Sequence, residues 1–84
     1  MFYIKTIKPN SENYSISITY DDNITIIADF GHLMEMGIMT QLKDPAVFDQ
    51  VQIGGQGRSI IWPEQDIDFC ADGLRLKYIQ SKAA

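Results

Sequence analysis

Apolar and polar residues alternate strictly over residues 14–20. Tyrosine and isoleucine occupy the even positions, and serine or threonine occupies the odd ones. A period of two places alternate side chains on opposite faces of a strand, so the segment predicts a half-buried β-strand. Asp21-Asp22-Asn23 tolerates the left-handed backbone of tight turns, and residues 24–29 are again rich in isoleucine. The pattern therefore predicts a β-hairpin over residues 14–29.

Three further segments have the composition of strands. Residues 2–8 combine aromatic and β-branched side chains and end before Pro9, so we expect a strand that pairs antiparallel beside the hairpin. Residues 51–53 and 58–62 flank a glycine-rich turn, and Pro63 stops the second of them. Together these strands predict a small antiparallel sheet.

Two capping signals predict helices. Asp44 is placed to cap a short helix that begins at Pro45, because a carboxylate accepts from orphan amides and proline suits the first helical position. Asp68 is placed to cap a last helix from about Phe69 towards Gln80. Residues 30–37 lie between a strand end and a glycine, and they predict one or two further helical turns.

This order of elements predicts one α+β domain over residues 1–80, with a frayed tail at 81–84. The expected architecture is three strands, a short helical segment, a two-strand hairpin and a C-terminal helix, with the helices on one face of the sheet. The 84 residues suffice for one domain, and a hydrophobic content of 45% excludes a disordered chain.

Charge and cysteine content narrow the function classes. The net charge of −4 and the scattered basic residues disfavour nucleic-acid binding by this chain alone, although binding within an assembly stays open. The single cysteine, Cys70, excludes an intrachain disulfide. The start of the sequence lacks the pattern of a signal peptide, and no apolar run is long enough for a membrane span. We therefore expect a cytoplasmic protein without membrane association.

Candidate chemistry is sparse, and no cofactor is expected. Asp29, His32 and Glu35 are spaced by three residues, so a helical turn would gather them into a small metal-binding or hydrolytic site. A polar loop at a strand end is the favoured interpretation of the same triplet. Cys70 would need an activating partner to act as a nucleophile, and a small packing residue is favoured there.

The segment that favours an interaction surface follows the hairpin. It is rich in methionine, whose flexible side chain adapts to partner proteins. The single tryptophan is a second candidate contact residue, although core packing is the favoured interpretation for both groups. The candidate surface residues are Phe30, Leu33, Met34, Met36, Met39 and Trp62.

Several of these segments together resemble a known family. They are Asp29-Phe30 at the strand exit, Leu42-Lys43-Asp44-Pro45-Ala46-Val47-Phe48, Ile61-Trp62-Pro63 and Asp66-Ile67-Asp68. In combination they resemble the small prokaryotic domain-of-unknown-function family 2442. The resemblance covers about residues 2–76 and implies an α+β fold with an antiparallel sheet, without an established reaction.

The same resemblance implies a binding role. Some relatives carry the module ahead of a helix-turn-helix domain, and others are encoded beside small toxin-like partners, which suggests a regulatory or antitoxin-like function. No helix-turn-helix follows the module in this sequence, so direct DNA recognition is not expected. We therefore expect a non-enzymatic interaction module that binds a protein partner or forms a homo-oligomer such as a homodimer.

Overall fold

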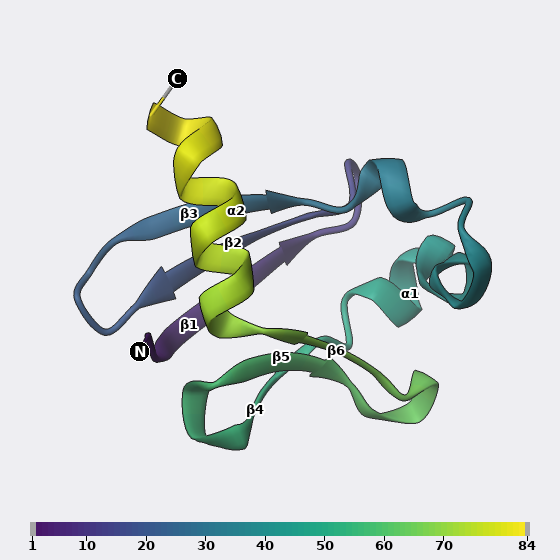
Figure 1. Cartoon of the computed structure of the whole chain (residues 1–84). Coiled ribbons are helices and arrows are strands. Elements are labelled where there is room, and N and C mark those ends of the chain that lie inside the picture. The colour runs from purple at the N-terminus through teal and green to yellow at the C-terminus, as the bar shows by residue number, and fades with distance from the viewer. Residues whose placement is uncertain (1, 84) are drawn as a thin grey trace.

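Two three-stranded antiparallel sheets form the framework of the domain (Figure 1). The computed structural model describes residues 2–83, and their side chains except those of Ile38 and residues 79–83. The first sheet has the order β1-β2-β3, and its strands are β1 (Ile4–Asn10), β2 (Ser15–Tyr20) and β3 (Thr25–Asp29). The second has the order β4-β5-β6, and its strands are β4 (Gln52–Gly54), β5 (Ser59–Trp62) and β6 (Ile67–Cys70).

Short helical pieces connect the strands, and one longer helix follows β6. Between the sheets the chain forms η1 (Gly31–Leu33), η2 (Gly37–Lys43) and α1 (Pro45–Phe48). Within the second sheet it forms η3 (Gly55–Gly57) and η4 (Pro63–Gln65), and it then continues into α2 (Ala71–Ala83). The tail expected at 81–84 is therefore helical up to residue 83, and Ala84 lies outside the described residues.

The hairpin predicted from the alternating pattern is confirmed. β2 pairs antiparallel with β3 and with β1, as expected for the first three strands. Ile16, Ile18 and Tyr20 are fully buried, because the even positions of β2 face the second sheet. The predicted cap at Asp44 is also confirmed, since its Oδ1 accepts from the Ala46 amide at 3.0 Å.

The segment after Pro63 differs from the prediction. Asp68 and Phe69 lie in a sixth strand, where the start of a helix was expected. β6 pairs with β5 in a register that sets Phe69 opposite Ile60, and α2 begins only at Ala71. Long-range backbone pairing with β5 outweighs the local capping signal of Asp68. With this sixth strand the described residues form two sheets of three strands, where one sheet was expected.

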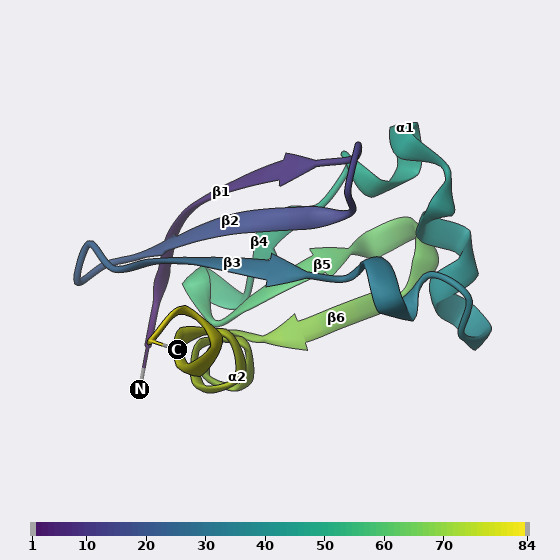
Figure 2. The same ribbon diagram turned by 90° about the horizontal axis from the view of Figure 1, so that it is seen from above.

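The hydrophobic core lies between the two sheets. Tyr20 and Ile26 come from the first sheet, and Ile60 and Trp62 come from the second, all fully buried. The indole Nε1 of Trp62 donates to the carbonyl of Phe48 at 3.0 Å, which satisfies its polar group inside the core. α2 stands beside both sheets on the side of β3 and β6, as Figure 2 shows.

Candidate functional site

An apolar groove opens where β6, η1 and α2 meet. Its volume is about 150 Å³. An apolar cavity of about that size accommodates a molecule as large as benzene, so the groove has room for one apolar side chain. We call it the α2–β6 groove, and its lining residues are Phe30, Leu33, Phe69, Cys70, Gly73, Leu74, Lys77 and Tyr78.

Aromatic packing fixes the floor of the groove. The ring centroid of Phe30 lies 5.0 Å from that of Phe69 and 6.3 Å from that of Tyr78. Phe30 also meets Trp62 edge to face at 6.1 Å, and only 1% of its surface is exposed. Edge-to-face and tilted ring contacts of this kind favour one geometry, so the floor is preformed.

α2 supplies one wall of the groove. Leu74 and Tyr78 are four residues apart and are both buried, because residues at that spacing share a helix face. The Tyr78 hydroxyl donates to the backbone carbonyl of Asp29 at 2.9 Å, which ties the helix to the edge of β3. Burial raises the pKa of Tyr78, so this phenol stays protonated and keeps its donor role at neutral pH.

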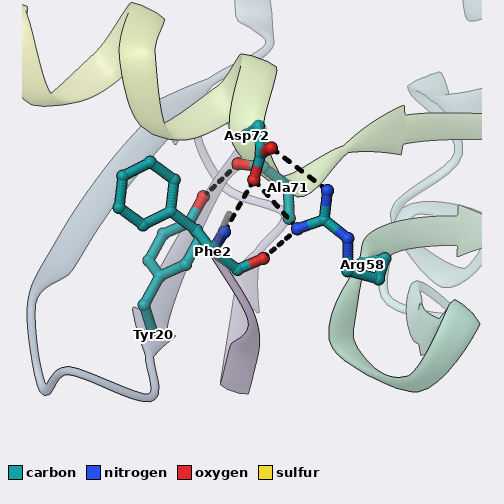
Figure 3. A network of polar contacts seen from close by, with 5 residues as sticks. All are labelled: Phe2, Tyr20, Arg58, Ala71 and Asp72. Atoms are coloured by element: carbon teal, nitrogen blue, oxygen red, sulfur yellow. Dashed lines mark hydrogen bonds and ion pairs between the residues drawn. The ribbon is translucent and has the colours of Figure 1, made fainter.

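A polar network holds the first turn of α2 in place (Figure 3). Asp72 accepts from both terminal nitrogens of Arg58, at 2.9 and 3.1 Å, and from the Phe2 amide at 2.8 Å. The hydrogen bonds from Arg58, together with that from Phe2, lower the pKa of Asp72 to about 2. The Tyr20 hydroxyl donates to the Ala71 carbonyl at 2.8 Å, and burial raises the pKa of Tyr20 to about 12. The network joins the chain start, β2, the residue that precedes β5, and α2, so the groove wall is fixed relative to both sheets.

The predicted interaction residues lie in three places: the groove, the core and the segment after η1. Phe30 and Leu33 line the α2–β6 groove. Met34 and Trp62 are buried in the core, so their side chains offer no exposed contact surface. Met36 and Met39 are exposed and half-buried, respectively, in the segment that follows η1. Of the six predicted residues, only Phe30 and Leu33 therefore share a surface hollow with residues of α2.

The predicted metal or hydrolytic triplet is not assembled. Asp29 Oδ1 accepts from the Gly31 amide at 2.9 Å, and Glu35 pairs with Lys43 at 2.7 Å. His32 is exposed on η1. Among the residues that the structure describes, no three His, Cys, Asp or Glu side chains are grouped so that they could hold a metal ion. Only His32 lies within η1, because Asp29 ends β3 and Glu35 follows the turn, so no single helical turn carries all three side chains.

The contribution of the last helix was not anticipated from the sequence. Gly73 and Lys77, like Leu74 and Tyr78, are four residues apart, and this spacing is the signal that places them on one side of α2. Cys70 was expected in the first turn of that helix. It instead ends β6, exposed at the rim of the groove.

None of the helices in the described part of the chain has the length and apolar character of a membrane span.

Comparison with known proteins identifies a family and no closer relative. Searches of curated proteins and of solved structures gave no significant match. Residues 4–80 match the sequence model of the family described as "Protein of unknown function (DUF2442)". This match covers most of the chain, which therefore belongs to the DUF2442 family.

Proposed function

We propose that this domain is a non-enzymatic protein-interaction module whose α2–β6 groove receives an apolar side chain of a partner protein. The observation that carries the proposal is the groove itself, a preformed apolar hollow at the surface of a small domain. Concave apolar sites with few polar groups are typical binding sites. A regulatory or antitoxin-like use of this binding is the setting that the family resemblance suggests.

The lining supports recognition by burial of apolar surface. Six of the eight lining residues are phenylalanine, leucine, tyrosine or glycine, and the Tyr78 hydroxyl is already bonded to Asp29. Burying a leucine-sized side chain stabilises a complex by about 1.5–3 kcal/mol. Because each 1.4 kcal/mol is a tenfold change in affinity, one well-seated side chain accounts for about tenfold to a hundredfold tighter binding.

A charge placed in the groove tests the proposal. Leu33 lines the groove and is half-buried, so Leu33→Glu should weaken partner capture about tenfold or more while the fold is retained. The matched control is Ile27→Glu on β3, because Ile27 is 56% exposed and lies outside the groove. Both variants are compared with the wild type by quantitative co-purification from the native cell, after circular dichroism has confirmed folding. Equal capture by wild type and Leu33→Glu would rule out the groove as the contact site.

A further inference from the structure

We infer that the occupant of the α2–β6 groove is an extended segment of a partner protein, which adds as a strand to the free edge of β6. This segment carries an apolar side chain into the groove and a basic side chain beside Asp68. The inference rests on the proposed function and names the class of partner. Strand addition combines main-chain hydrogen bonds for affinity with side-chain pockets for specificity.

The backbone of β6 presents unpaired groups at its outer edge. In the part of the chain that the structure describes, β6 is the last strand of its sheet and pairs only with β5. The register of β5 and β6 continues to Arg58 opposite Ala71. The Ala71 amide donates to the Arg58 carbonyl at 2.8 Å, so these two residues form a hydrogen-bonded pair of the ladder. Because hydrogen-bonded and non-bonded pairs alternate in antiparallel ladders, Asp68 and Cys70 belong to non-bonded pairs. Their N–H groups, and the Asp68 carbonyl, therefore point away from β5.

Two other strand edges are protected. α2 covers the edge of β3, where the Tyr78 hydroxyl donates a hydrogen bond to the Asp29 carbonyl. β1 contains Pro9 and a shift of register between Ile4 and Thr6, and both features interrupt a regular edge. The free edge of β6, in contrast, borders an apolar groove on the side where α2 stands (Figure 2).

The alternation of side chains connects this edge to the groove. Phe69 packs against Trp62 on the core side of its sheet and lines the groove, whereas Asp68 and Cys70 alternate with it and are exposed, with Cys70 at the rim of the groove. A residue of an added strand that lies opposite Phe69 points to the same side, so it enters the groove. Its neighbours in that strand point outward, beside Asp68. The partner segment must therefore be apolar at one position and hydrophilic at the next.

Charge identifies the hydrophilic positions as basic. Glu64, Asp66 and Asp68 are exposed in η4, the turn after it and β6. The ion pairs within the described residues engage Glu35, Asp72 and Asp22, and none of them involves Glu64, Asp66 or Asp68. Opposite charges across neighbouring strands stabilise pairing and like charges destabilise it. A second copy of this chain, with net charge −4, would bring the same acids together, so a basic strand from another protein is the favoured occupant.

Gly73 gives independent support. Glycine lowers helix stability relative to alanine, so a glycine in α2 needs a reason. A Cβ at this position would meet only the Cβ of Cys70, at 4.0 Å, so packing within the domain does not require its absence. Gly73 lines the groove, and the missing side chain leaves room for an incoming residue. The fold therefore does not require glycine at position 73, and a ligand residue that occupies this space would account for it.

A synthetic peptide provides the test. We would titrate ¹⁵N-labelled protein with a short peptide in which lysine alternates with valine and leucine, and follow backbone amides by NMR. The amides of Asp68 and Cys70 should shift and exchange more slowly with solvent when the peptide binds. The same peptide with N-methylated backbone amides should lose binding at least tenfold, because it cannot pair with the edge. A peptide with glutamate in place of lysine should also bind more weakly.

Variants of the protein separate the components of the site. Asp68→Lys should weaken binding of the lysine peptide about threefold or more, whereas Asp49→Lys makes the same charge change outside the groove and should have no effect. Gly73→Ala should raise the melting temperature yet weaken peptide binding, because the added methyl fills groove space. Gly73→Val should weaken binding further. If Gly73 had only a structural role, its replacement by alanine would not lower the affinity for the peptide while it raised the melting temperature.

The outcomes distinguish this inference from the proposed function. If Leu33→Glu abolishes partner capture but the lysine peptide leaves the Asp68 and Cys70 amides unchanged, the groove binds a partner and strand addition is refuted. If those amides are already protected without peptide and sedimentation shows a dimer, the occupant is a second copy and the inference is again refuted. If Leu33→Glu leaves capture unchanged while the peptide pairs with β6, the edge binds and the proposed function fails.

Discussion

Replacement of Tyr20 by phenylalanine removes one buried hydroxyl and keeps the ring. The Tyr20 side chain is fully buried, and its hydroxyl donates to the carbonyl of Ala71 at 2.8 Å. This bond joins the end of β2 to the first residue of α2. The ring contact with Phe2 at 6.1 Å and the position of Arg75 over the ring at 5.0 Å should persist in Tyr20→Phe. The variant therefore isolates one hydrogen bond that fixes the groove wall.

The size of the effect follows from burial. A typical intramolecular hydrogen bond contributes about 0.5–1.5 kcal/mol, and a buried acceptor that loses its partner adds a desolvation penalty. The Ala71 carbonyl lies in the first turn of α2, so the helix still satisfies part of its acceptor capacity. We therefore expect Tyr20→Phe to lower the free energy of unfolding by about 1–2 kcal/mol. For a domain of this size the melting temperature should fall by about 5–10 °C.

A second tyrosine provides the matched control. The Tyr14 hydroxyl donates to the Lys43 carbonyl at 2.6 Å in an exposed position, where water can replace it. Tyr14→Phe should therefore change the free energy of unfolding by about 0.5 kcal/mol or less. Urea denaturation followed by circular dichroism measures both variants, and equal slopes with denaturant would confirm the same unfolding transition. If Tyr14→Phe and Tyr20→Phe lowered the free energy of unfolding equally, the hydrogen bond from Tyr20 to Ala71 would not be a buried, stabilising contact.

Three further substitutions test other parts of the framework. Gly57 has φ +94°, and a Cβ there would lie 2.9 Å from the carbonyl oxygen of Ile4, so Gly57→Ala should destabilise the domain by about 1–2 kcal/mol or more in urea denaturation. The hydrogen bond from Arg58 holds the pKa of Asp72 at about 2, below the value near 3.9 of an unfolded carboxyl. Its stabilising contribution is thus complete above about pH 4 and is lost as the pH falls towards 2, so Asp72→Asn should flatten the fall in melting temperature over that window. Trp62→Phe removes the buried indole donor and part of the ring, so thermal denaturation should show a free energy of unfolding lower by about 2–3 kcal/mol. A decrease below about 1 kcal/mol would contradict the core role of Trp62.

Local patterns were sufficient for the elements whose signals lie within a few residues. The alternation over residues 14–20 predicted β2 and its inward face, because side-chain direction in a strand depends only on sequence parity. Asp44 and Pro45 predicted the start of α1, because a cap bonds to an amide two residues away. The family resemblance was likewise carried by short motifs, and the match over residues 4–80 confirms it.

The tertiary structure decided what depends on distant partners. Asp68 has the chemistry of a helix cap, yet pairing with β5 made residues 67–70 a strand, because a ladder of long-range hydrogen bonds outweighs one local bond. The α2–β6 groove joins Phe30 and Leu33 to residues of α2 more than 35 positions later in the chain, so no sequence window contains it. The sequence by itself therefore determined the first hairpin, the cap at Asp44 and the family. Packing of α2 against both sheets determined which apolar residues remain accessible to a partner.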